Sequence, residues 1–535
     1  MTTYADVVAA VLADHGIEYI FGVPGSLSSV ELIEAASKRG IRYVLCSNES
    51  SAAAMAGVYG VMRNRPGVIS TGVGPGAVAA VPGVTHLFME RAPALVLTDR
   101  YGDAEFRRLP RQRIEQDRVF RPITKGTFKI AQDNAATVIR RAIDLALDGR
   151  PGPVHVDLPY DVMLAAAPET DLPAPDTRRR FLATTGADNP GLAAVIDAIE
   201  RAQRPVVIAG LQVARSGPTA ESAFLDLVEA LGVPVLASLA AKGALPEQHP
   251  LAAGTFRGVA SERALLDKAD LIVLIGFDAV EIFTPGVWHY SVPVVSVDET
   301  PFVEGPYTPD IEVVADLKDA LPVLARGVTR HAGWNREDVD AYRGSRDAAL
   351  HPSSNGKGLM PGAIIRIARE RLPDAGIVTV DAGQHKVLTS DLWQTRRPRG
   401  FHSSSGLGTM AVAIPAALAA KLVEPAAPVL CLVGDGGFLM RVGDLETAVR
   451  EELPIVIVVF NDRTLNLIKL QQDRRGYGRV GTSFADCDFA AVARGFGFEA
   501  TRVSSEADLD AALGEAFASG RPWLIDAVTD SDGYV

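Results

Sequence analysis

The chain has 535 residues, of which 47% are hydrophobic and 22% charged, and its formal net charge is −12. This length exceeds what one hydrophobic core usually serves and predicts about three domains. The acidic balance argues against a general nucleic-acid surface or an anionic-membrane patch. Three widely spaced cysteines, Cys46, Cys431 and Cys487, argue against a disulfide framework and against a thiolate metal cluster.

We expect no targeting signal in the first residues. Residues 1–6 lack the basic and apolar regions of a signal peptide, and no uninterrupted apolar run approaches the roughly 20 residues that span a bilayer. We therefore expect a cytoplasmic protein that binds neither membranes nor nucleic acid.

Short β-rich runs alternate with amphipathic stretches in three successive segments. In residues 1–165 the runs lie at 19–22, 43–46, 67–70, 94–97 and 154–157, and in residues 185–328 at 205–210, 233–236, 270–276 and 293–297. In residues 358–535 they lie at 376–381, 429–434, 455–460 and 523–528. This alternation predicts the α/β class, as three consecutive domains with parallel sheets. Polar or proline-rich stretches at 168–180 and 331–357 are predicted linkers.

The most informative motif joins a strand end to a carboxylate. The run that ends at Val433 is followed by Gly434-Asp435-Gly436-Gly437-Phe438, and the next run ends at Asn461-Asp462. Glycines let backbone approach a ligand, and an α/β sheet binds phosphate at the carboxyl ends of its strands. We expect Asp435 to anchor Mg²⁺ or Ca²⁺ and Asp462 to supply a second oxygen ligand.

This motif resembles the Gly-Asp-Gly to Asn motif of thiamine-diphosphate-dependent enzymes, and the whole chain resembles the acetohydroxyacid synthase (acetolactate synthase) branch. The resemblance implies thiamine diphosphate and Mg²⁺ as cofactors, a pyrimidine-binding first domain and a diphosphate-binding third domain. It also implies the backbone carbonyl of Thr464 as a metal ligand. Asp462 stands where the family has Asn, and Gly437 where relatives often have Ser. Asn461 is the alternative ligand if the strand is shifted by one residue.

Further motifs of the third segment resemble parts of the same cofactor site. Gln384-His385 resembles a turn that contacts diphosphate. In Gly406-Leu407-Gly408-Thr409-Met410, the resemblance implies that Met410 bends the cofactor and that the Gly408 carbonyl accepts from its 4′-amino group. Without it, Met410 would be read as a core residue. The remaining implied cofactor contacts are Gly434, Gly436, Gly437, Phe438, Leu465 and Ile468.

Glu49 is the candidate activating acid. It follows the run at 43–46 and opens a helix of small residues. A buried carboxylic acid at the pyrimidine N1′ favours the tautomer that deprotonates the thiazolium carbon, and the family places its Glu at this position. The alternative is a Glu favoured only by the helix dipole. Asn48 stands where many relatives have His.

Three segments of the first domain resemble the acetohydroxyacid synthase branch: residues 22–26, 72–76 and 111–116. The resemblance implies that Ser26 lies over the thiazolium and Gln112 near the substrate. The paired histidines of pyruvate-decarboxylase-like enzymes are not apparent in residues 101–121, and Ile468 replaces an acid found in such decarboxylases.

These residues together predict a carboligase or lyase acting on a 2-oxo acid, with decarboxylation and then transfer of the enamine to an acceptor. Two alternatives stay open: a non-oxidative 2-oxo acid decarboxylase that releases an aldehyde, and a catalytically silent cofactor-binding subunit. The central domain holds FAD in some relatives, but residues 254–258 give no distinctive dinucleotide fingerprint, so FAD is not predicted. Relatives build the site between subunits, which implies a homodimer or homotetramer.

Overall fold

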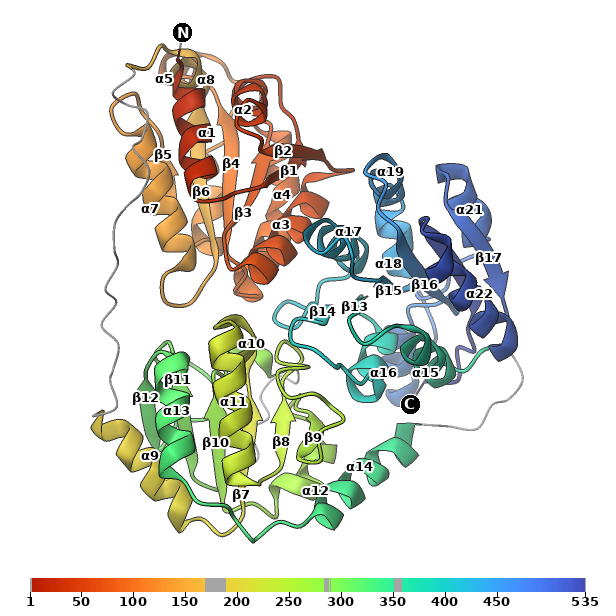
Figure 1. Ribbon diagram of the computed structural model, residues 1–535. Helices are drawn as coiled ribbons and strands as arrows, with labels where there is room; N and C mark the ends of the chain where they lie inside the picture. Colours follow the sequence, from red (N-terminus) through yellow and green to blue (C-terminus); the bar gives the residue numbers. More distant parts are fainter. Residues whose placement is uncertain (1, 169–188, 283–287, 289, 351–357, 535) are drawn as a thin grey trace. The chain divides into compact units, whose positions relative to one another are not determined.

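A computed structural model of the protein describes residues 2–168, 189–282, 288, 290–350 and 358–534. The chain forms two compact units. The first comprises residues 1–181, 418–425 and 443–451, and the second comprises 182–417, 426–442 and 452–535. Three six-stranded sheets lie in these units, and their strands pair only in parallel (Figure 1), which confirms the predicted α/β class. Residues 169–180 of the first expected linker lie outside the described residues.

The first sheet has the strand order β2-β1-β3-β4-β6-β5. Strand β1 pairs with β2 on one side and with β3 on the other, so the chain connections on the two sides of β1 run in opposite directions. α/β sheets bind ligands at such a point, which here lies between β1 and β3. The strands are β1 (Tyr19–Val23), β2 (Arg42–Leu45), β3 (Gly67–Thr71), β4 (Ala94–Arg100), β5 (Thr127–Lys129) and β6 (Pro153–Pro159). The helices are α1 (Tyr4–Asp14), α2 (Ser28–Ser37), α3 (Glu49–Arg63), α4 (Pro75–Met89), α5 (Asp103–Arg108), α6 (Gln116–Phe120), α7 (Ala135–Leu147) and α8 (Tyr160–Leu164).

The second unit contains the central sheet, in the order β12-β11-β10-β7-β8-β9. Its strands are β7 (Pro205–Ala209), β8 (Val235–Ala237), β9 (Ala252–Thr255), β10 (Leu271–Ile275), β11 (Val294–Asp298) and β12 (Ile311–Val314). Its helices are α9 (Pro190–Arg201), α10 (Leu211–Arg215), α11 (Pro218–Leu231), α12 (Arg263–Leu266) and α13 (Leu317–Gly327).

The second expected linker contains a helix that the sequence analysis did not predict, α14 (Arg336–Leu350). Arg336 pairs with Asp340 one turn later at 3.4 Å, and Val339 and Tyr342 are buried. Two apolar contacts and i,i+4 ion pairs support a helix even where the composition is polar, as it is here.

The third sheet has the order β14-β13-β15-β16-β18-β17. Here β13 lies between β14 and β15, so the chain connections run in opposite directions from β13, and the ligand-binding point of this sheet lies between β13 and β15. The strands are β13 (Ile377–Val380), β14 (Phe401–Ser403), β15 (Val429–Gly434), β16 (Ile455–Asn461), β17 (Glu499–Val503) and β18 (Trp523–Val528). The helices are α15 (Pro361–Arg371), α16 (Gln384–Leu392), α17 (Ala413–Val423), α18 (Asp435–Arg441), α19 (Asp444–Arg450), α20 (Asn466–Arg474), α21 (Phe489–Phe496) and α22 (Glu506–Ser519).

Burial explains why the central strands were visible in the sequence. Every residue of β3, β7, β10, β11, β13 and β16 is buried, so these strands are mostly apolar. Cys46, Cys431 and Cys487 are unpaired, as expected. Among the helices that the structure describes, none has the length and apolar character that a membrane span requires.

Candidate active site

A pocket of about 200 Å³ opens where β13, β15 and β16 end, next to the point at which the connections of the third sheet part. It is lined by backbone and side chains of the segments that follow these strands. Twelve predicted residues line it: Gln384, His385, Gly408, Met410, Gly434, Asp435, Gly436, Gly437, Asp462, Thr464, Leu465 and Ile468. Phe438 does not line it, because its side chain is buried in the core against Phe489, with ring centroids 5.0 Å apart.

Two carboxylates face each other in this pocket. Asp435 is the first residue of α18, and its Oδ1 accepts from the backbone N–H of Gly436 at 2.6 Å. Its Oδ2 is buried and has no hydrogen-bond partner. Burial and the neighbouring Asp462 raise the pKa of Asp435, and burial likewise raises that of Asp462. Such a pair is relieved by a cation bound between the two carboxylates.

Asp462, and not Asn461, is directed into the pocket. The Asp462 carboxylate accepts from the backbone N–H of Thr464 at 3.0 Å and from the side-chain amide of Asn466 at 3.1 Å. Asn461 is the last residue of β16, and its buried amide donates to Asp526 at 2.8 Å and to the carbonyl of Cys487. Consecutive strand residues point to opposite faces. Of the two residues that the sequence offered as metal ligands, only Asp462 lines the pocket.

His385 provides a neutral donor or acceptor at the start of α16. Burial is the main cause that lowers its pKa, to about 3, so the ring is uncharged near neutrality. The ring stacks on Phe460 with centroids 5.2 Å apart, and Nε2 is buried without a partner. A Cβ on Gly383 would lie 2.7 Å from His385 Cε1, so the glycine, at φ +154°, is what allows the ring to lie against the turn.

Asp381 directly follows β13 and fixes the loop that carries Met410. The sequence analysis includes it only as the last residue of the run at 376–381. Its fully buried carboxylate accepts from the backbone N–H groups of Ala411, Val412 and Ala413 at 2.8, 2.9 and 3.2 Å. A Cβ on Gly436 would lie 3.4 Å from Met410 Cε, so Met410 packs over the glycine turn. A carboxylate directly after a buried strand was the signal that could have identified Asp381.

The other predicted residues lie in the first unit, on segments that follow β1, β2 and β4. Glu49 is the first residue of α3, and the Asn48 side chain caps this helix by accepting from the N–H of Ser51 at 2.9 Å. The Glu49 side chain is half-buried, and burial raises its pKa. A Cβ on Gly76 would lie 3.1 Å from Glu49 Oε1, so the carboxyl group lies against the start of α4.

The segments that carry Ser26 and Gln112 contact the same glycine loop. A Cβ on Gly74 would lie 2.7 Å from the carbonyl oxygen of Gln112, and one on Gly25 would lie 2.6 Å from the Gly72 Cα. Gln112 has a positive φ of 57°, which is uncommon for a residue with a side chain and fits a constrained functional loop. Ser26 and Gln112 are both exposed. The structure thus gathers Ser26, Glu49 and Gln112 around residues 72–76.

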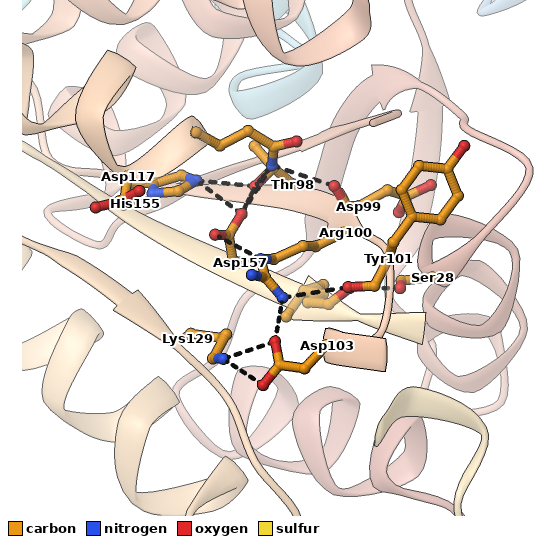
Figure 2. Close-up of polar contacts among 12 residues, drawn as sticks. Ser28, Thr98, Asp99, Arg100, Tyr101, Asp103, Asp117, Lys129, His155 and Asp157 are labelled. Atoms are coloured by element: carbon orange, nitrogen blue, oxygen red, sulfur yellow. Dashed lines mark hydrogen bonds and ion pairs between the residues drawn. The ribbon is translucent and has the colours of Figure 1, made fainter. Parts of the chain in front are cut away.

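A buried polar network holds the far end of the segment that carries Gln112 (Figure 2). The Gln116 amide donates to Asp157 at 2.7 Å and to Thr98 at 2.9 Å, and Thr98 also contacts His155 and Asp157, both at 2.8 Å. Arg100 continues the network from Asp157, at 3.6 Å, to Asp103 and Lys129. Because Gln116 opens α6, these bonds fix where the loop before it returns to the sheet.

Comparison with known proteins matches all three sheets. Residues 2–118 match the thiamine pyrophosphate enzyme N-terminal TPP binding domain, residues 192–324 the central domain, and residues 381–527 the C-terminal TPP binding domain. The chain belongs to the thiamine pyrophosphate enzymes. Its cofactor is thus thiamine diphosphate, and it is an enzyme that forms or cleaves carbon–carbon bonds.

Similar members of this family are acetolactate synthases. A probable acetolactate synthase large subunit of Methanocaldococcus jannaschii is 29% identical, over 98% of this chain and 92% of its own length. The isozyme 3 large subunit of Escherichia coli is 28% identical, over 100% and 96%. The acetolactate synthase of Bacillus subtilis is 28% identical, over 98% and 93%.

The pocket fits the polar end of the family's cofactor. A diphosphate with a divalent metal needs hard oxygen ligands at one end and hydrogen-bond groups at the other. Two buried atoms without hydrogen-bond partners, Asp435 Oδ2 and His385 Nε2, belong to residues that line this pocket and can provide these functions. Within the described residues no three His, Cys, Asp or Glu side chains are grouped to hold a metal, so the carboxylate pair needs backbone and cofactor oxygens to complete a shell.

The surroundings of Gly437 leave no room for a side chain. A Cβ on Gly437 would lie 2.0 Å from Asp381 Oδ2, a carboxylate held by three backbone donors. We expect Gly437→Ser to lower the free energy of unfolding by about 1–3 kcal/mol, measured in denaturant, because the added atoms overpack a fixed group. Gly478→Ser, where a Cβ meets nothing within 4 Å, is the control. Equal stability of both variants would mean that Asp381 can move aside.

Proposed function

We propose that this enzyme is an acetolactate-synthase-like carboligase, which decarboxylates a 2-oxo acid and transfers the remaining acyl unit to a second carbonyl compound. The observation that carries this proposal is the apolar wall of the pocket. Met410, Leu465 and Ile468 line it and bear no titratable group. A wall without an acid disfavours protonation to a free aldehyde and favours capture by a carbon electrophile.

In this proposal the cofactor's polar end is held by the third sheet. Asp435, Asp462 and the backbone carbonyl of Thr464 bind Mg²⁺, which is the usual metal of the family. Gln384 and His385 contact the diphosphate, with the backbone of Gly434, Gly436 and Gly437 against it. The buried position of Asp435 supports this assignment, since an ionised carboxylate without a cation is costly there.

Residues of the first and third domains are assigned to the reacting end of the cofactor. Bound thiamine diphosphate supplies a thiazolium carbon that stabilises negative charge on the substrate carbon. Glu49 shares a proton with the pyrimidine N1′, and its partial burial supports this role because it keeps the carboxyl group protonated for longer as pH rises. Met410 holds the cofactor bent, and the Gly408 carbonyl accepts from the 4′-amino group. Ser26 and Gln112 orient the substrate.

We further propose that the active form is at least a homodimer, in which Glu49 of one subunit serves the metal site of the next. Large apolar side chains are exposed at or beside the pocket: Leu407, Leu439, Met440, Leu467 and Ile468. Exposed apolar groups gathered near one site are typical of protein interfaces. Whether two dimers associate into a tetramer is decided by sedimentation of the purified protein.

The proposal is tested by the products that the pure enzyme forms. Thiamine diphosphate, Mg²⁺ and a panel of 2-oxo acids are supplied singly and in pairs, CO₂ release is followed and products are identified by mass. We expect CO₂ release with a product that contains both carbon skeletons. A free aldehyde as the main product would instead assign a simple decarboxylase, and CO₂ release without any dependence on the cofactor would contradict the chemistry altogether.

A further inference from the structure

The segment after the last strand returns to the metal-binding end of the pocket. After β18, Thr529 donates its backbone N–H to the Asn461 carbonyl at 3.0 Å, and Asp530 donates to the Leu359 carbonyl at 2.9 Å. Gly533 closes a turn onto the Asp530 carbonyl at 3.1 Å. A Cβ on Gly533 would lie 2.7 Å from Pro361 Cδ, so this turn packs tightly against the start of α15. Residues 529–534, which we call the return turn, are therefore held in a defined conformation.

Helix α20 secures the return turn from the other side. Lys469 Nζ donates to the Ser531 carbonyl at 3.0 Å and pairs with Asp532 at 2.8 Å. The Asn466 amide donates to the same Ser531 carbonyl at 2.7 Å and to the Asp462 carboxylate at 3.1 Å. Both side chains are buried. A single amide thus connects the return turn to a carboxylate that the proposed metal site uses.

Tyr534 makes the second connection. Its side chain is buried and lines the pocket with Asp462, and its hydroxyl lies within reach of the Asp462 carboxylate. Asp462 therefore has two polar side-chain neighbours: Asn466, which donates a hydrogen bond to it, and Tyr534. Donors to a ligating carboxylate orient it and set its affinity for the metal.

These contacts explain how the pocket accommodates a second carboxylate beside Asp435. An amide at this position brings no charge, whereas Asp462 adds one that is buried beside Asp435. We propose that Tyr534 and Asn466 are positioning residues for the metal, which offset the charge of Asp462 and aim its carboxylate toward the cation. The inference rests on the metal role of Asp462 and does not depend on which substrate the enzyme uses.

The test is a double-mutant cycle read out as Mg²⁺ affinity, not as activity. Protein stripped with chelator is titrated with Mg²⁺ by calorimetry at saturating thiamine diphosphate. We expect Tyr534→Phe to weaken Mg²⁺ binding about tenfold, in the range for loss of one outer-sphere partner. In an Asp462→Asn background the hydroxyl has no carboxylate to orient, so the same Tyr534→Phe change should alter binding less than about twofold.

Two further variants make the outcome decisive. Asn466→Ala removes the other donor and should also weaken binding about tenfold, which keeps the test open if Tyr534→Phe does not fold. Tyr477→Phe, at a tyrosine that is 63% exposed, should bind Mg²⁺ like the unaltered enzyme.

Equal effects of Tyr534→Phe on Mg²⁺ affinity in both backgrounds would show that Tyr534 contributes only packing. Tighter Mg²⁺ binding by Tyr534→Phe would mean that the ring obstructs the site; either result overturns the inference. Unchanged binding in Asp435→Asn would show that the metal lies elsewhere, whatever product the enzyme makes.

Discussion

Glu49→Gln is expected to lower turnover by about 10²- to 10⁴-fold, the usual contribution of a positioned acid or base. Gln keeps the shape of the side chain at the start of α3 but cannot share a proton with the pyrimidine N1′. The half-buried position of Glu49 and its raised pKa suit a carboxyl group that must stay protonated for part of the cycle. Initial rates of CO₂ release, with cofactor affinity measured in parallel, check this expectation.

The control for Glu49→Gln is Glu34→Gln, a change of the same kind on α2, where the side chain is 68% exposed. It should leave the rate within about twofold, as surface changes usually do. Cofactor affinity of Glu49→Gln should stay close to that of the unaltered enzyme. An unchanged rate of CO₂ release in Glu49→Gln would contradict the assignment of Glu49 as the activating acid. A lower rate that is explained wholly by weaker cofactor binding would show that Glu49 only binds the cofactor.

The second large effect is expected from Asp435→Asn. This change removes the charge of the proposed metal anchor while it keeps its size, and it should weaken Mg²⁺ binding by more than about 100-fold, because even outer-sphere partners contribute 10- to 100-fold. Thiamine diphosphate binding should weaken with it, since the metal neutralises the diphosphate. Calorimetric titration of the stripped protein with Mg²⁺ and cofactor gives both affinities.

Asp226→Asn, at an exposed carboxylate on α11 in the same unit, serves as the matched control and should bind Mg²⁺ normally. Removal of the buried charge at 435 should not unfold the protein, because in the absence of metal this carboxylate lacks a partner for Oδ2. Retained Mg²⁺ affinity in Asp435→Asn would place the metal at another part of the chain.

Strands could be predicted from the sequence where burial on both faces makes them apolar. The five strands that no predicted run covers, β5, β9, β12, β14 and β17, all lie at sheet edges. An edge strand pairs on one side only, and β5, β12 and β17 are largely exposed or half-buried. Without a continuous apolar run, such segments resemble loops until the neighbouring strand that they pair with is known.

The candidate site divides in the same way between local and non-local information. Asp435 was readable because a buried strand, a glycine turn and a helix follow one another within a few residues, and Glu49 because a strand is followed directly by a helix start. Phe438, predicted as a cofactor contact, does not line the pocket, since a position in the motif does not tell which way the side chain of a helical residue points. Its ring joins the core against α21.

By itself, the sequence determined the α/β class, the segments that end in a glycine turn, and the candidate residues for a metal diphosphate, because each depends on neighbours a few positions apart. Only the tertiary structure decided that Asp462 and not Asn461 faces the pocket, that Asp381 secures the Met410 loop, and that Tyr534 returns to the pocket beside Asp462. These depend on strand register and on contacts between residues far apart in the chain, such as Asp462 and Tyr534. Hydrogen bonds over such separations leave no periodic signal in the chain, because they form only once the sheet has brought its strand ends together.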